Sequence, residues 1–157
     1  MDDLGIDNEV FYNAGQSGSG ITINIGANVT KIPAYLFCAD SSSENAPKIV
    51  AVNFAEGSVC ESIGEDAFSY CSNLASIIIP NSATTIDTDA FSYCRGLESI
   101  TIPNSVTTIG GGVFAYCSGL TSVTIGSGVE SISDTAFRNC TKLASITIPK
   151  NVTAIRS

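Results

Sequence analysis

The chain has 157 residues, of which 44% are hydrophobic and 14% are charged. It therefore has enough apolar material for the core of one folded domain, which argues against a disordered protein. Its formal net charge is -8 with only seven Lys and Arg residues, which argues against a nucleic-acid partner because a phosphate backbone is bound by a clustered basic face.

The amino end is acidic and contains Gly and Ser. Met1-Asp2-Asp3 is unlike the start of a secretory signal, and the longest apolar run, around Ile77–Ile79, is far shorter than the ~20 residues of a membrane span. We therefore expect no membrane span, and either a cytoplasmic protein or a trimmed piece of an exported one. Residues 1–19 are interpreted as an extension or cap that precedes the repeats.

Two irregular repeat units follow this extension. The first has apolar residues at Ile23, Ile25, Val29, Ile32 and Phe37. A loop insertion at residues 39–48 separates it from the second unit. That unit is lengthened between Ala55 and Glu61, and its apolar residues are Ile49, Val52, Phe54 and Ile63.

A regular repeat occupies the rest of the chain. One short sequence motif recurs at an interval of 23 residues, as Ala67–Cys71, Ala90–Cys94, Val113–Cys117 and Ala136–Cys140. Such a period indicates one supersecondary unit that stacks on copies of itself. We expect a single repeat domain over residues 1–157, with about six coils over residues 20–157 and the last coil incomplete.

The pattern inside one coil predicts its elements. Ser99–Ile102 alternates polar with β-branched apolar residues, which predicts a short strand that Pro103 ends. Ser105–Ile109 predicts a second extended piece, and the three-residue spacing of Phe114, Cys117 and Leu120 predicts a helical or 3₁₀ turn. Each coil then returns to its start, so successive strands should be parallel and about 4.8 Å apart.

The run Cys94–Ile109, followed by Val113-Phe114, resembles the 23-residue leucine-rich repeat of the BspA-like (treponemal type) family. The resemblance implies a β-rich α/β leucine-rich-repeat solenoid that is right-handed, with its Ile-x-Ile-Pro strands on the concave face. It also implies membership among bacterial or protozoan surface proteins that attach to host matrix proteins or to other cells. The chain departs from the pattern at Gly126, which replaces the proline, and at Val113, which replaces the alanine.

Cysteine is repeated in the same register. Cys71, Cys94, Cys117 and Cys140 should lie about 5 Å apart, within disulfide range, but stacked copies point the same way. We therefore expect reduced thiols in the core. Cys38 and Cys60 lie outside this pattern and are the better candidates for a disulfide. The chain has no Cys-x-x-Cys pair and no histidine, so we expect no zinc.

Catalytic patterns are also missing. Without histidine, serine and cysteine nucleophiles lack their usual general base, and no phosphate-binding loop occurs, so we expect neither enzyme activity nor a cofactor. Carboxylates gather near one turn of the coil, at Glu65, Asp66, Asp87, Asp89 and Asp134. They could form a calcium site or a general-acid pair, but we favour helix caps at Asp66 and Asp89, because Gly112 and Thr135 replace them in later coils.

Function is therefore expected on the surface. The candidate partner-binding residues form two rows on the strands and one row of tyrosines: Ser76, Ser99, Ser122 and Ser145; Ile78, Thr101, Thr124 and Thr147; Tyr70, Tyr93 and Tyr116. Small hydroxyls make a flat face for a partner, although they are also ordinary solvent-facing strand residues. The tyrosines are either contact residues or a row that stabilises the stack.

Two hypotheses for function follow. The first is a noncatalytic, extracellular or cell-surface module that binds a protein, such as a host matrix protein or another surface protein, with a glycan as the other kind of partner. The second is a structural spacer or stalk with no ligand of its own. Ile146, Ile148 and Ile155 would leave an uncapped apolar end. We therefore expect either further native sequence beyond residue 157 or self-association through this coil.

Overall fold

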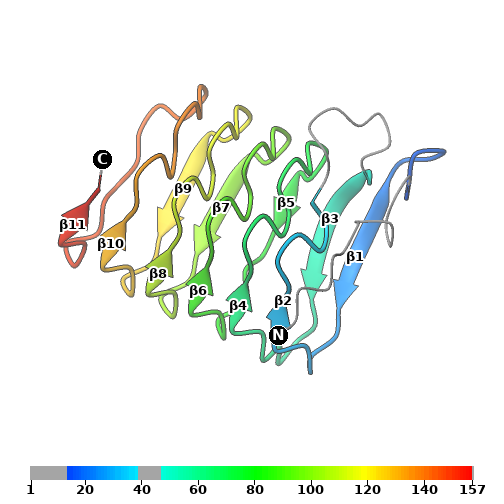
Figure 1. The fold of residues 1–157 in the computed structure, drawn as a ribbon, viewed down its shortest axis with the longest axis horizontal. Coiled ribbons are helices and arrows are strands. Elements are labelled where there is room, and N and C mark those ends of the chain that lie inside the picture. The colour runs from blue at the N-terminus through cyan, green and yellow to red at the C-terminus, as the bar shows by residue number, and fades with distance from the viewer. Residues whose placement is uncertain (1–13, 39–46, 157) are drawn as a thin grey trace.

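The computed structural model describes residues 14–38 and 47–156, which form a stack of coils along one axis (Figure 1). Much of the expected extension and most of the expected loop insertion lie outside the described residues. The longer strands of successive coils are β1 (Ile21–Ile25), β3 (Ile49–Phe54), β5 (Ser76–Ile77), β7 (Ser99–Ile102) and β9 (Ser122–Ile125). The shorter strands are β2 (Lys31–Ile32), β4 (Ser62–Ile63), β6 (Thr85–Ile86), β8 (Thr108–Ile109), β10 (Ser131–Ile132) and β11 (Ala154–Ile155).

The strand pairs of the described residues are parallel, and those between regular coils have the 23-residue register that the repeat predicts, whereas the β1–β3 pair has a register shift between Ile21 and Thr22. β7 pairs with β9 so that Ser99 lies beside Ser122 and Thr101 beside Thr124. The longer strands form two sheets, β1-β3-β5 and β7-β9, and the shorter strands form β2-β4-β6-β8 and β10-β11. The described part of the chain is thus the predicted solenoid, and its longer-strand side is interrupted between β5 and β7.

Alternation decides which side of each strand is buried. In β7, Ile100 and Ile102 are buried while Ser99 and Thr101 are exposed. Ile109, at the end of β8, is buried as well. The isoleucines of both strands therefore meet inside the coil, where burial of each side chain contributes about 1.5 to 3 kcal/mol.

The turn that carries the phenylalanine differs from the expected helical or 3₁₀ turn. Its backbone has three-residue hydrogen bonds, such as Ser92 N–H to the Asp89 carbonyl at 2.9 Å. However, Asp89 and Tyr93 adopt left-handed φ angles of 52° and 58°, which a right-handed helix does not allow. The N–H groups of Asp89 and Tyr93 donate instead to carbonyls of the next coil, so the described residues contain no helix.

The helix-cap interpretation of Asp66 and Asp89 is therefore wrong. These residues occupy the first left-handed position of the turn, with φ 51° and 52°, and Gly112 and Thr135 occupy it in later coils, with φ 62° and 56°. Aspartate and glycine adopt this region more readily than most residues. The Asp66 and Asp89 carboxylates accept hydrogen bonds from Ser69 and Ser92 within the same turn.

Phenylalanines form the centre of the core. Phe68, Phe91 and Phe114 are fully buried and stack face to face, with ring centroids 5.3 and 5.6 Å apart. Phe37 extends the row at one end and the half-buried Phe137 at the other. Each ring is thus packed between rings of the adjacent coils, so the stability of one coil depends on its neighbours.

The four repeated cysteines are buried thiols, as expected. Each thiol donates a hydrogen bond to the carbonyl oxygen of a phenylalanine one coil earlier. The Sγ–O distances are 3.2 Å for Cys71 to Phe37, 3.2 Å for Cys94 to Phe68, 3.1 Å for Cys117 to Phe91 and 3.1 Å for Cys140 to Phe114. Cys38 and Cys60 are also thiols, so the disulfide considered for them is absent from the structure.

We predict that the repeated cysteines resist alkylation in the folded protein. Burial raises the pKa of the Cys117 thiol from its ordinary value of 9.0 to about 12, so almost none of it is the reactive thiolate at pH 8. Iodoacetamide labelling followed by peptide mass spectrometry should modify Cys38 first, because it is only half-buried. Labelling of Cys117 should increase around pH 9 in urea but remain low there in the native state.

The sixth coil is more open than the others. Residues 144–148 form no strand, and β11 pairs only with β10. Ile146 is half-buried, Ile148 is 38% exposed and Ile155 is 67% exposed. The apolar surface expected at this end of the stack is therefore present. No helix long and apolar enough for a membrane crossing is found among the residues that the structure describes.

Candidate functional site

The two predicted rows lie on the exposed side of the longer strands. Ser76, Ser99, Ser122 and Ser145 are exposed, and so are Ile78, Thr101, Thr124 and Thr147. The pairing of β7 with β9 aligns the central members of both rows. The last members, Ser145 and Thr147, lie in the coil without a long strand. We call this surface the sheet face.

Asparagines continue the sheet face toward the amino end. The β1–β3 register places Asn24 beside Asn53, and the Asn53 amide nitrogen donates to the Asn24 side-chain oxygen over 3.2 Å. The β3–β5 register places Val52 beside Ile77, so Asn53 and Ile78 are the next residues of neighbouring strands. The sequence analysis missed both asparagines, although aligning the irregular second coil on Val52 would have identified Asn53.

Ile78 is the exception on this face. It is the apolar member of a row that is otherwise formed by Asn and Thr, and its side chain is 81% exposed. A large aliphatic side chain held in water forgoes the free energy that burial would provide. Ile78 is therefore unlike the buried isoleucines on either side of it in the chain, Ile77 and Ile79.

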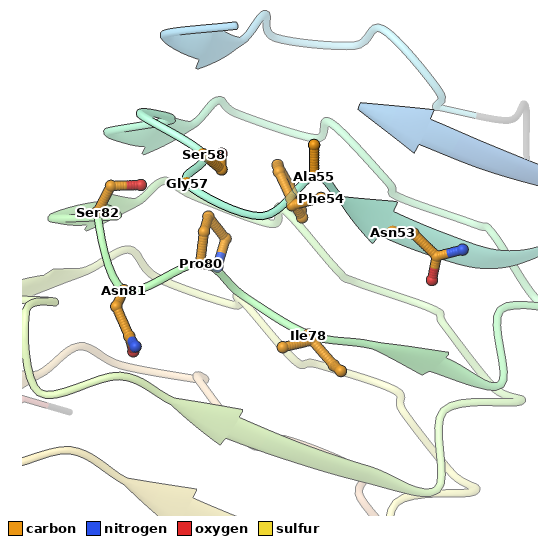
Figure 2. Close-up of a pocket in the computed structure, with 9 residues that line it drawn as sticks. All are labelled: Asn53, Phe54, Ala55, Gly57, Ser58, Ile78, Pro80, Asn81 and Ser82. Atoms are coloured by element: carbon orange, nitrogen blue, oxygen red, sulfur yellow. The ribbon is translucent and has the colours of Figure 1, made fainter. Parts of the chain in front are cut away.

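Two hollows flank Ile78. The first, of about 400 Å³, lies between the segment after β3 and the segment after β5 (Figure 2). Its lining includes Phe54, Gly57, Pro80 and Asn81. The second, of about 310 Å³, lies toward β7, where the sheet is interrupted, and its lining includes Ser99, Thr101 and Pro103. No charged side chain lines either hollow.

The tyrosine row forms a second surface. The Tyr70 and Tyr93 rings stack with centroids 4.3 Å apart, and the Tyr93 and Tyr116 rings with centroids 4.4 Å apart. Arg138 lies over the Tyr116 ring at 5.7 Å from its centroid. Burial, together with the neighbouring tyrosine hydroxyls, raises the pKa of Tyr93. Most ring faces are thus used within the stack, and mainly ring edges and hydroxyls remain for a partner.

A smaller hollow of about 250 Å³ is lined by the three tyrosines and by Asp66 and Asp89. Burial raises the pKa of both carboxyl groups, and the hydrogen bonds from Ser69 and Ser92 oppose that shift. Within residues 14–38 and 47–156, no group of three His, Cys, Asp or Glu side chains is placed to hold a metal ion.

The chain matches a known protein family. Residues 44–157 match the family described as the BspA type leucine rich repeat region, in six copies. A comparison with curated proteins gave no match.

Several solved structures have a similar fold. A leucine rich cell surface protein from Faecalibacterium prausnitzii A2-165 is 35% identical, with a TM-score of 0.74 over 87% of this chain and 35% of its own. A leucine-rich repeat protein from Bacteroides ovatus ATCC 8483 is 26% identical, with a TM-score of 0.63 over 87% of this chain and 39% of its own. The T. pallidum leucine-rich repeat protein is 24% identical, with a TM-score of 0.60 over 88% of this chain and 74% of its own. The chain thus spans little more than a third of the first two proteins.

Proposed function

Because this chain belongs to the BspA-type leucine-rich repeat family, we propose that it is a noncatalytic interaction module that binds a protein partner through its sheet face. The observation that supports this proposal best is the exposure of both predicted rows on one side of the stack, with an apolar residue, Ile78, among them. Ser and Thr lose little side-chain entropy on binding, so such a face can be covered at low cost.

We propose that the module acts at a cell surface or outside the cell. The similar Faecalibacterium prausnitzii protein is described as a cell surface protein, which supports this location. The partner would be a host matrix protein or another surface protein. A glycan is the alternative ligand, and self-association through the open sixth coil is a further mode of assembly, supported by the exposure of Ile148 and Ile155.

The alternative function is that of a spacer in a larger surface protein. The continuous rows of stacked Phe and Tyr rings and of thiol hydrogen bonds favour this reading, because they link each coil to the next. A stack of this kind can hold another domain at a distance without any ligand of its own.

We predict that Thr124→Arg on the sheet face weakens partner binding at least tenfold, because the long charged side chain prevents close contact. Thr108→Arg is the matched control, since Thr108 is also exposed but belongs to the shorter strand β8. Surface plasmon resonance on immobilised fibronectin, laminin and collagen, together with a glycan array, would measure the effect. A protein that binds none of these probes would favour the spacer. If a probe is bound and the two variants bind it equally well, the contact lies outside the sheet face.

A further inference from the structure

We propose that Ile78 and its two hollows are the centre of the sheet-face contact, and that they accept an uncharged segment of a protein partner that carries large apolar side chains. We call this region the Ile78 site; it comprises Ile78, Asn53, Phe54, Pro80, Asn81 and Thr101. The inference rests on the proposed function and names the location and chemistry of the contact.

The arrangement of the site is that of a contact centre. Ile78 lies on the segment after β5 and lines the first hollow together with Phe54 (Figure 2). It also lines the second hollow together with Thr101. At about 400 and 310 Å³, the hollows are at the lower end of the roughly 300 to 1,000 Å³ of ligand pockets. Side chains of a partner that enter them would cover Ile78 from both sides and remove it from water.

The fold does not require isoleucine at this position. Thr101, Thr124 and Thr147 occupy the equivalent position in later coils, where they are exposed. The apolar side chain of Ile78 therefore contributes nothing that threonine does not provide for the stack. Within its row, Ile78 is an apolar residue between Asn53 and Thr101. An exposed apolar residue of this kind matches the pattern of interface hot spots, which are surrounded by near-neutral contacts that exclude water.

The charge of the site points to the kind of partner. Neither hollow has a charged side chain in its lining, although the chain carries a formal net charge of -8. A charged segment would lose hydration here without gaining a counter-ion. An uncharged segment avoids that cost, and the amides of Asn53 and Asn81 can donate to and accept from its backbone.

The Ile78 site is less suited to a glycan or to a second copy of this chain. Sugars bind well against open aromatic ring faces, and the only aromatic ring in the two linings is that of Phe54, which is half-buried. The exposed apolar residues proposed for self-association, Ile148 and Ile155, lie in the sixth coil and not at this site. An uncharged protein segment is thus the occupant that the lining favours.

A selection experiment tests this inference. A phage-displayed library of random nine-residue peptides would be selected on the wild-type protein, and synthetic copies of the enriched peptides would be titrated by fluorescence anisotropy. We expect peptides of zero net charge that contain large apolar residues. Ile78→Thr should weaken their binding at least tenfold and Asn81→Ala by a smaller factor. Thr108→Ala, a change on the shorter strand β8 outside the sheet face, should leave binding unchanged.

Any result other than the expected one would overturn the inference. Charged peptides would contradict the proposed chemistry, and binding that Ile78→Thr leaves intact would contradict the location. If those peptides still respond to Thr124→Arg, the sheet-face function stands and only the Ile78 site fails. If nothing is enriched, or if light scattering shows a dimer that Ile78→Thr dissociates, then the occupant is not an uncharged protein segment. Urea unfolding would establish that the variants are as stable as the wild type.

Discussion

Replacing Phe91 by Ala is expected to lower the free energy of unfolding by about 3 to 5 kcal/mol. Phe91 is fully buried and its ring is stacked between Phe68 at 5.3 Å and Phe114 at 5.6 Å. Its removal leaves a cavity in the middle of the stack and breaks the contact between coils on either side. Because a domain of this size is stable by only about 5 to 15 kcal/mol, a large part of the total stability would be lost.

Phe137→Ala is the matched control for Phe91→Ala. Phe137 is only half-buried and stacks on one described ring, that of Phe114 at 5.6 Å. Urea unfolding followed by circular dichroism should give a clearly smaller loss for this variant, and its transition should remain cooperative. Equal losses for the two variants would contradict the nearest-neighbour account of the core.

The sequence was sufficient to predict the register of the stack. Residues such as Phe68, Phe91 and Phe114 recur at one interval, so the same side chain meets itself in every coil and a shift would misalign the whole row. The alternation in Ser99–Ile102 likewise indicated which side chains would be buried. These features depend on periodicity, and periodicity is visible in a single sequence.

The conformation of the phenylalanine turn was not predictable in the same way. Its three-residue spacing resembles that of a 3₁₀ turn, but alternate N–H groups, such as those of Asp89 and Tyr93, are needed to join the next coil. The left-handed φ angles at these residues permit that arrangement. A contact between coils therefore overrides the local preference, and local spacing carries no information about it.

The candidate site was predictable in part. Alternation indicated the rows of the sheet face, including Ile78. The hollows beside Ile78 were not predictable, because they depend on how the turn after Phe54 and the interruption between β5 and β7 are placed in space. The first feature arises where the irregular second coil meets the regular coils, and the second lies between the third and fourth coils. A partner that recognises the site would thus recognise a departure from the repeat, which the regular coils do not offer.

Replacing Gly110 by Ala is expected to destabilise the protein by about 2 to 3 kcal/mol. A Cβ atom at this position would lie 2.5 Å from the carbonyl carbon of Asp87 and 2.6 Å from the Cα of Thr88, both backbone atoms of the preceding coil. Relief of this clash would lengthen the hydrogen bond from the Gly110 N–H to the Ile86 carbonyl, now 2.8 Å. The repeat alone predicts that a side chain is tolerated at this position, because Ser133 occupies the equivalent position one coil later.

Gly111→Ala is the control for this prediction, because the nearest atom to its Cβ would be the Asp134 Oδ1 at 3.4 Å, an ordinary contact. The free energy of unfolding of this variant should change by no more than about 0.5 kcal/mol, since the substitution leaves the hydrogen bonds between coils intact. Urea unfolding of the two variants, made at adjacent positions with the same added methyl group, isolates the effect of contact between coils. If Gly110→Ala is as stable as Gly111→Ala, the coils are not packed as closely at this turn as the structure indicates.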